Sequence, residues 1–499
     1  MLRSLRPQAI RNIFLILLSA VLLVIPYCRQ GFWVTAWFAF VPLFFALQYK
    51  RPKQSFLIAY LAGIISWAGT IYWLVHITLP GTIVLILYLA LYFGFFGLAV
   101  SYLSSSKFCL LSIPSAWVFL EYARSHVMTG FPWALLGYSQ YKNLPVIQIA
   151  DIFGVWGVSF LVVAVNVFLF RIISSRPWVP GNKIRLIFPV LLIILTLGYG
   201  YYRLSPVPNT QHQTTIKISV VQGNIPQSLK WKIGSEDFIF NRYLELTSEA
   251  IKDKPDLIIW PEAALPVVLE EDLSYYDYLT QRVKESGVPL LFGAVTQREG
   301  FYYNSALLLD KEGKLSGRYD KVHLVPFGEY IPLRKVFPFL QTVVPIGDVE
   351  AGKEYTIFQV PNKLGVLICF EDLFPEISRA YTLKGAGLLV NITNDAWYKY
   401  TSASFQHLQA SVFRAVENRL PLARAANTGV SCFILPDGKV VSMVKDAKGE
   451  DIFIKGFVTE DISFKTANPS LFTRYGDYFP VFCLIFAFLP LIIRKIKHV

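Results

Sequence analysis

Charged residues are scarce in this sequence. Asp, Glu, Lys and Arg make up 16% of its 499 residues, while hydrophobic residues make up 54%, and the mean hydropathy is +0.45. Soluble globular proteins carry about 25% charged residues, so these proportions exclude an ordinary soluble protein and favour a membrane protein. The length leaves room for several membrane spans and for a separate soluble domain with its own core.

Cysteine and histidine are also few. The five cysteines form no C-x-x-C pair, which argues against a disulfide framework, although one bridge between Cys369 and Cys432 stays open. The six histidines show no H-x-x-x-H or clustered spacing. We therefore expect no metal site, and no motif calls for a cofactor.

The formal net charge is +13. The basic residues gather in short segments between apolar runs, where Lys and Arg set topology and meet anionic lipid headgroups. No nucleic-acid-binding module accompanies them, so we expect a membrane surface as the partner and no nucleic acid.

Eight apolar runs have the length and composition of candidate membrane spans. They occupy residues 13–27, 33–47, 56–75, 82–102, 109–121, 155–172, 186–202 and 478–493, of which the second and fifth are short. The first lacks a small-residue cleavage site after its apolar core, so we expect it to stay as an anchor.

Basic residues flank the runs before the first and after the second, fourth, sixth and eighth: for example Arg3, Arg6 and Arg11 precede the first, and Lys50, Arg51 and Lys53 follow the second. With eight spans and both termini cytoplasmic, all these clusters fall on the cytoplasmic side. The sequence therefore predicts a membrane domain at 1–204, an extramembrane domain on the outer face at 205–475, and a final helix with a basic tail at 476–499.

The loop between the fifth and sixth runs, residues 130–141, is rich in aromatic and small residues. A re-entrant or interfacial segment on the outer face and a simple aromatic belt are equally compatible with it.

Short strands and helices alternate in the region between the seventh and eighth runs. Nearly all-apolar strand candidates lie at 217–221, 257–259, 289–295, 365–369 and 388–393, and helical patterns lie at 238–251, 273–285, 376–383 and 404–416. Such interleaving predicts a layered α/β domain with buried sheets. We also predict that the Pro- and Phe-rich segment 327–345 moves as a lid.

Three residues of this region have the chemistry of a nucleophilic site. Cys369 ends an apolar strand candidate, Glu262 follows another, and Lys321 lies in a mixed-charge stretch. A thiol nucleophile needs a base for its proton and a cation for the developing negative charge. Each residue also has a purely structural alternative. Cys369 could be a packed thiol, Glu262 a solvated carboxylate in a turn, and Lys321 a surface lysine paired with Asp320.

The motifs around these residues resemble a known superfamily. Trp260-Pro261-Glu262, the stretch from Tyr319-Asp320-Lys321 to Gly328-Glu329-Tyr330, and Ile368-Cys369-Phe370-Glu371 are similar to the Glu, Lys and Cys motifs of the carbon–nitrogen hydrolase (nitrilase) superfamily. The eight-run frame, together with residues 130–140 and 154–157, resembles its membrane branch, the apolipoprotein N-acyltransferase family. The resemblance implies a nitrilase-like αββα sandwich beside the membrane helices.

The family resemblance implies a ping-pong acyl transfer at a bacterial inner membrane. Cys369 would take an acyl chain as a thioester from a phospholipid, and the expected donor position is sn-1 of phosphatidylethanolamine. Glu262 would act as base, and Lys321 with backbone N–H groups near Phe370 would hold the oxyanion. The acceptor would be the diacylglyceryl-cysteine at the N-terminus of an apolipoprotein.

The same resemblance assigns supporting or substrate-binding roles to Trp231, Glu329, Phe370 and Glu371. An interfacial aromatic is the alternative for Trp231, and a structural salt bridge is the alternative for Glu329. A monomer is the simplest expectation. Two other functions stay open: a membrane-tethered amidase or nitrilase, and a non-catalytic paralogue.

Overall fold

The structure is a computed structural model that describes residues 2–174, 183–205, 214–330, 349–464 and 468–496. Most of the segment predicted to be a lid, 327–345, lies outside the described residues. The chain divides into two compact units. Unit 1 comprises residues 1–206, 401–409 and 475–499, and unit 2 comprises residues 207–400 and 410–474.

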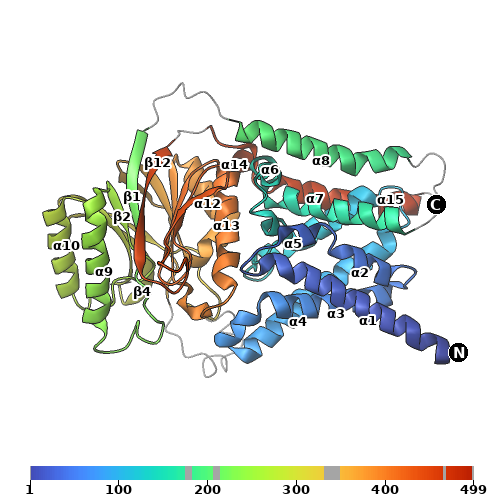
Figure 1. Cartoon of the computed structure of the whole chain (residues 1–499), viewed down its shortest axis with the longest axis horizontal. Helices are drawn as coiled ribbons and strands as arrows, with labels where there is room; N and C mark the ends of the chain where they lie inside the picture. Colours follow the sequence, from blue (N-terminus) through green and yellow to red (C-terminus); the bar gives the residue numbers. More distant parts are fainter. Residues whose placement is uncertain (1, 175–182, 206–213, 331–348, 465–467, 497–499) are drawn as a thin grey trace. The chain divides into compact units, whose positions relative to one another are not determined.

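Unit 1 is helical (Figure 1). Each of the eight predicted apolar runs falls on a helix. The first and third runs end in a 3-10 turn, and the second begins with one. The helices are α1 (Leu2–Val24), α2 (Phe40–Leu47), α3 (Pro52–Thr70), α4 (Leu79–Leu103), α5 (Cys109–His126), α6 (Leu144–Ile147), α7 (Ala150–Ile173), α8 (Lys183–Leu204) and α15 (Tyr478–Ile496). Proline at the first or second position of α3 and α4 suits a helix start, where the missing N–H costs nothing.

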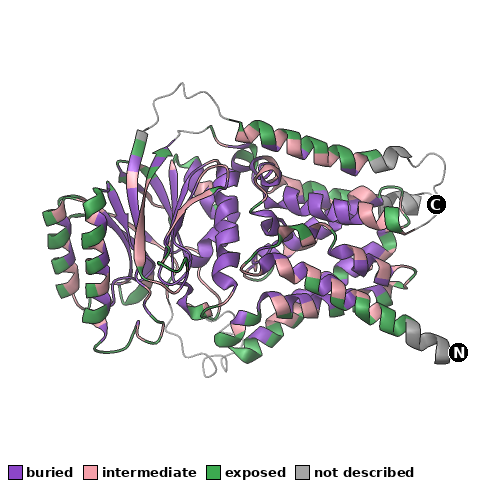
Figure 2. Ribbon diagram, in the orientation of Figure 1, coloured by how far each residue is buried: buried purple, intermediate pink, exposed green. Residues whose placement is uncertain are grey.

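Several of these helices are suited to a bilayer. Among the described residues, four segments are long and apolar enough to cross one: Gln8–Tyr27, Leu79–Leu103, Ala150–Ile173 and Ile187–Leu204. Trp33–Leu47 and Tyr478–Leu489 are shorter apolar helices. Helices α1, α4 and α8 include many exposed residues (Figure 2). Large apolar residues are among them, for example Phe14, Val84 and Leu195. Apolar surface of this kind is typical of contact with lipid. The eight-span topology itself stays a prediction.

The aromatic loop at 130–141 folds back into unit 1. Trp133 is 1% exposed and Leu136 is 3% exposed. Arg124 on α5 donates through Nη1 to the carbonyl oxygens of Phe131 at 2.6 Å and Trp133 at 2.9 Å. The Glu121 Oε1 atom accepts a hydrogen bond from the Leu136 N–H at 2.7 Å. These two charged residues of α5 therefore hold the backbone of the loop.

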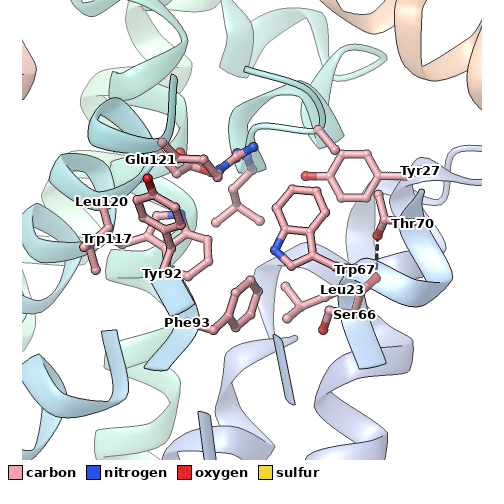
Figure 3. Close-up of a pocket in the computed structure, with 13 residues that line it drawn as sticks. Leu23, Tyr27, Ser66, Trp67, Thr70, Tyr92, Phe93, Trp117, Leu120 and Glu121 are labelled. Atoms are coloured by element: carbon pink, nitrogen blue, oxygen red, sulfur yellow. Dashed lines mark hydrogen bonds between the residues drawn. The ribbon is translucent and has the colours of Figure 1, made fainter. Parts of the chain in front are cut away.

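A small cavity of about 40 Å³ lies beside this anchor in unit 1 (Figure 3). Aromatic rings supply much of its lining, among them those of Trp67, Tyr92 and Trp117, and the head of Glu121 lies at its edge. The rings shield the charged groups of α5 from bulk solvent, which strengthens their hydrogen bonds to the loop.

Unit 2 contains two six-stranded sheets. The first has the order β12-β1-β2-β3-β4-β5 and the second the order β11-β10-β9-β8-β7-β6. In each sheet three central strands are parallel and the outer ones antiparallel. The strands are β1 (Thr214–Gln222), β2 (Leu257–Ile259), β3 (Leu290–Arg298), β4 (Phe301–Leu309), β5 (Leu315–Asp320), β6 (Ile357–Val360), β7 (Asn362–Ile368), β8 (Leu388–Thr393), β9 (Leu422–Ala426), β10 (Cys432–Ile434), β11 (Val440–Met443) and β12 (Gly456–Phe464).

Helices cover the outer face of each sheet. Helices α9 (Glu236–Ala250) and α10 (Ser274–Ser286) lie on one side of the two sheets, and α12 (Pro375–Leu383) and α13 (Ala403–Asn418) lie on the other (Figure 1). The remaining helix, α14 (Leu471–Tyr475), is short. The central strands are buried (Figure 2). These layers confirm the predicted α/β/β/α sandwich.

Candidate active site

Glu262 lies just beyond the end of β2, after Trp260 and Pro261. Trp260 is fully buried and donates its indole N–H to Thr247 on α9 at 2.8 Å, which fixes the end of the strand. The residue after Glu262 is Ala263, with φ of +44°, a left-handed conformation rare for residues with a side chain. Glu262 is 8% exposed, so the solvated turn predicted as the alternative is wrong.

Lys321 follows β5 directly and is 1% exposed. Its Nζ atom lies 2.8 Å from Glu329 Oε2 and 3.9 Å from Glu262 Oε1. Burial alone would lower the pKa of Lys321, but the carboxylates of Glu329 and Glu262 outweigh it and raise that pKa. Asp320 pairs with Arg318 instead. The alternative of a surface lysine paired with Asp320 is therefore wrong, and Lys321 is a buried lysine whose charged form is favoured by two carboxylates.

Asn304 on β4 joins the two carboxylates. Its Nδ2 atom donates to Glu262 Oε1 at 2.7 Å and to Glu329 Oε1 at 2.9 Å. Its main-chain carbonyl accepts a hydrogen bond from the Lys321 N–H at 2.8 Å. One asparagine thus fixes the lysine backbone and both acidic partners of the lysine side chain. Glu329 also accepts from the Val325 N–H at 2.7 Å, so it is more than a simple salt-bridge partner.

Cys369 follows the carboxyl end of β7 and opens a short 3-10 helix, Cys369–Leu373. Its φ is +53°, a strained conformation for a residue with a side chain. The carboxamide of Asn391 on β8 donates to the Cys369 carbonyl at 3.1 Å and so holds this conformation. The carboxyl ends of β2 and β7 both belong to parallel strands, where sites usually form.

The electrostatic surroundings of Cys369 favour the thiol in the absence of substrate. Burial is the main cause that raises the pKa of Cys369, and the negative charge of Glu262 raises it further. The ammonium of Lys321 and a hydrogen bond with Thr393 lower it in part. The nucleophile, the carboxylate and the lysine therefore interact with one another, and a base is needed to remove the thiol proton.

Glu371, two residues after Cys369, is fully buried and ties the nucleophile segment to the lysine segment. One carboxylate oxygen accepts from the Ile368 N–H at 2.8 Å. The other accepts from the Tyr319 hydroxyl at 2.7 Å and the Val322 N–H at 2.8 Å. Burial raises the pKa of Glu371 to about 6, although these hydrogen bonds oppose the rise. Glu371 therefore supports the geometry of the site.

Arg424 on β9 is fully buried and supports the segment that begins at Cys369. Its guanidinium lies 3.2 Å from a carboxylate oxygen of Asp372 and 3.2 Å from one of Asp395. It also donates to Asn391 Oδ1 at 2.5 Å. Since Asn391 in turn donates to Cys369, the buried ion network fixes the main chain of the nucleophile.

The remaining predicted site residues differ in exposure. Trp231 is 51% exposed. Phe370 is buried at 6% exposure, and its ring packs at 5.2 Å from that of Phe374, edge to face. Among the described residues no group of three His, Cys, Asp or Glu residues could hold a metal ion.

The sequence motifs did not point to Asn304, Arg424 or the buried Lys230. Asn304 lies on a strand, Phe301–Leu309, whose residues are aromatic at the start, polar in the middle and apolar at the end, and nothing in that pattern marks one amide. Arg424 lies in the apolar run Leu422–Ala426, where an internal charge was the signal available. Lys230 precedes Trp231 in the segment that the family resemblance had already highlighted.

Chemically, the arrangement combines a thiol, a buried carboxylate and a buried ammonium at one end of two sheets. Such a set suits covalent acyl transfer, because the carboxylate can move a proton while the ammonium stabilises an oxyanion.

Comparison with known proteins covers both units. Residues 19–168 match the apolipoprotein N-acyltransferase N-terminal domain family, and residues 217–463 match the carbon–nitrogen hydrolase family. A protein of Geobacter metallireducens named apolipoprotein N-acyltransferase is 38% identical over 95% of this chain and 93% of its own length. The chain belongs to the apolipoprotein N-acyltransferase family.

Other proteins named apolipoprotein N-acyltransferase are also similar to this chain over nearly its whole length. The apolipoprotein N-acyltransferase of Haemophilus ducreyi is 30% identical over 93% of each chain, and apolipoprotein N-acyltransferase 1 of Treponema denticola is 31% identical over 96% of this chain and 95% of its own length. Among solved structures, an amidase from Nesterenkonia sp. has 19% identity, covers 52% of this chain and 92% of its own, and has a TM-score of 0.40.

Proposed function

We propose that this protein transfers an acyl chain from a phospholipid to the N-terminal diacylglyceryl-cysteine of apolipoproteins, the last step of bacterial lipoprotein maturation. The observation that carries the proposal is membership of the apolipoprotein N-acyltransferase family over nearly the whole chain. The buried contact between Glu262 and Lys321, with Cys369 electrostatically coupled to both, supplies chemistry that fits.

The first half-reaction acylates Cys369. Glu262 takes the thiol proton as the sulfur attacks the ester carbonyl of the phospholipid. Negative charge develops on the carbonyl oxygen and is stabilised by the Lys321 ammonium and by backbone N–H groups near Phe370. The carbon–oxygen bond then breaks, Glu262 returns its proton to the leaving oxygen, and a lysophospholipid departs from the thioester.

The second half-reaction transfers the acyl chain. The neutral α-amino group of the lipoprotein attacks the thioester carbonyl, and Glu262 accepts a proton from the nitrogen. The carbon–sulfur bond breaks, the proton returns to sulfur, and an amide is released. A thioester suits two bulky lipid substrates that cannot occupy one pocket together, because it stores the acyl group between two visits and is opened readily by an amine.

In this proposal the other site residues support substrates or geometry. Glu329 holds Lys321, Glu371 fixes the segment around the nucleophile, and the exposed Trp231 contacts substrate. Phosphatidylethanolamine is the proposed donor, and the enzyme is proposed to act as a monomer without a cofactor.

The proposed location is the bacterial inner membrane, crossed eight times with both termini cytoplasmic. The exposed apolar faces of α1, α4 and α8 support embedding in a membrane. The catalytic domain at 205–475 would then face outward, because the basic clusters that flank the short loops and termini all fall on the cytoplasmic side in this topology. The membrane domain is proposed at 1–204 and the final helix with its tail at 476–499.

An acyl-transfer assay tests the proposal against the amidase alternative. Purified protein in detergent is supplied with phosphatidylethanolamine labelled in its sn-1 chain and with a synthetic diacylated lipopeptide. Label on the lipopeptide amine supports the proposal. Hydrolysis of simple amides without any labelled lipopeptide would favour the amidase, and no reaction of either kind would favour the non-catalytic paralogue.

A further inference from the structure

Lys230 is a buried lysine that the proposed chemistry does not use. It lies in the segment between β1 and α9, is 5% exposed, and its neighbours Trp231 and Lys232 are both exposed. Its Nζ atom donates to the main-chain carbonyl oxygen of Glu262 at 2.9 Å. A lysine is rarely buried to this extent unless its ammonium has a specific partner.

The Glu262 carbonyl group that accepts the hydrogen bond from Lys230 lies in a tightly packed turn. It leads into Ala263, which has a left-handed main chain, and Gly293 on β3 packs against this turn so closely that a Cβ there would lie 2.6 Å from Glu262 Cα. The main chain around Glu262 is thus fixed on one side by the sheet and on another by the ammonium. The carboxylate of Glu262 is in turn directed to Asn304.

Lys230 is also electrostatically coupled to the reacting groups. The titratable groups with which its ammonium interacts electrostatically are Glu262, at the end of β2, and Cys369, after β7. Burial is the main cause that lowers the pKa of Lys230, to about 8, and the negative charges of Glu262 and Cys369 oppose that decrease. The site therefore contains two buried lysines of different character, because the pKa of Lys321 is raised instead.

We propose that Lys230 is a second cationic positioning residue of the active site, which fixes the Glu262 turn through its carbonyl and, while charged, favours the thiolate of Cys369. The inference deepens the proposed function and rests on it for the role of the thiolate. In physical terms, a charged Lys230 stabilises the anion that forms when Glu262 removes the thiol proton, and a neutral Lys230 does not. Charge and position can be separated experimentally, because burial lowers the pKa of Lys230 to about 8, within a pH range in which the protein can be assayed.

The test measures alkylation of Cys369 by iodoacetamide, which needs no lipid substrate. In this reaction the thiolate sulfur forms a bond to carbon and iodide leaves, so the rate follows the population and reactivity of the thiolate. The full-length protein in detergent is reacted between pH 6.5 and pH 9.5, and the peptide containing Cys369 is quantified by mass spectrometry. The variants are Lys230→Met, Lys230→Arg and the matched exposed control Lys232→Met.

We expect Lys230→Met to be alkylated about tenfold more slowly than the wild type below pH 7, which corresponds to one pKa unit in the thiol. The deficit should vanish as the pH rises through about 8, because the wild-type lysine then loses its own charge. Lys230→Arg, which stays charged, should be faster than the wild type above that pH, and Lys232→Met should match the wild type throughout.

A deficit in Lys230→Met that is the same at every pH would show a merely structural role and overturn the proposal, as would the absence of any deficit. Thermal unfolding of each variant identifies a loss of fold, and Lys230→Arg provides the charge-preserving comparison if Lys230→Met unfolds. Because no acyl donor is involved, failure here is distinct from failure of acyl transfer itself.

Discussion

Replacing Arg424 by methionine should destabilise unit 2 strongly. The substitution keeps most of the side-chain volume and removes the charge. Arg424 is fully buried and lies 3.2 Å from Asp372 and 3.2 Å from Asp395, both of which are fully buried as well. Without the guanidinium two carboxylates are left uncompensated in a dry interior. Removing one partner of a buried ion pair costs about 3–5 kcal/mol.

This loss can be measured as a shift in the thermal unfolding midpoint. For a unit of this size each kcal/mol corresponds to about 2–4 °C, so Arg424→Met should unfold at least about 6 °C lower than the wild type at the same scan rate. The matched control is Arg282→Met on α10, where Arg282 is 47% exposed and pairs with Glu285 at 2.8 Å. An exposed pair of this kind contributes about 0.3–0.5 kcal/mol, which is a shift of at most about 2 °C.

A second comparison isolates the electrostatic cause. Adding Asp372→Asn and Asp395→Asn to Arg424→Met removes the two uncompensated charges and should recover part of the lost stability. If Arg424→Met unfolds no lower than Arg282→Met, or if the triple variant is less stable than the single one, the buried ion network does not hold the nucleophile segment as argued.

Two further results are expected. Asn304→Leu removes the hydrogen bond to the carboxylate of Glu262, which is worth about 1.5–3 kcal/mol, so kcat for acyl transfer should fall about tenfold to a hundredfold. A purely structural role would instead lower the unfolding midpoint and preserve kcat in the folded fraction. The pKa of Glu371 is raised from 4.5 to about 6, so its contribution to stability is present below pH 4.5 and is lost as the pH rises through about 6, by about 2 kcal/mol. Thermal unfolding across this range should show that step in the wild type and not in Glu371→Gln, and an identical step in the variant would assign it to another group.

The apolar pattern of the sequence predicted much of the fold. Each predicted strand coincides with part or all of β1, β2, β3, β7 or β8, and the predicted helices of this region coincide with α9, α10, α12 and α13. These elements are buried on both faces or have one clear apolar face, so their pattern is strong. Several strand boundaries were wrong by one to three residues. The strand predicted at 365–369, for example, ends at Ile368, and Cys369 begins a 3-10 helix.

Other elements had weaker signals. The hairpin of β4 and β5 was not predicted, because Phe301–Leu309 begins with partly exposed aromatic residues and Leu315–Asp320 is short and polar. The run predicted at 56–75 is divided in the structure into α3, which ends at Thr70, and a 3-10 turn at Tyr72–His76. A hydropathy pattern does not register such a break, since the residues on both sides are apolar.

For the candidate site, the sequence predicted the three central residues but not the residues that hold them in place. The chemistry of the residues and the resemblance of their motifs to the carbon–nitrogen hydrolase superfamily pointed to Glu262, Lys321 and Cys369. The structure places the Lys321 ammonium 3.9 Å from the Glu262 carboxylate and couples all three residues electrostatically. The partners that hold them were not predictable, because Asn304 and Lys230 act through contacts between residues distant in the chain. Only the pairing of strands in the folded sheets brings such residues together.

The most direct test of the acyl-enzyme is the intact mass of the protein after incubation with phosphatidylethanolamine, compared between the wild type and Cys369→Ala. We expect the wild type to gain the mass of one acyl chain, hydroxylamine to remove it, and the variant to show no gain. A folded wild-type protein that gains no mass, or a variant that gains the same hydroxylamine-sensitive mass, would contradict acyl transfer through Cys369.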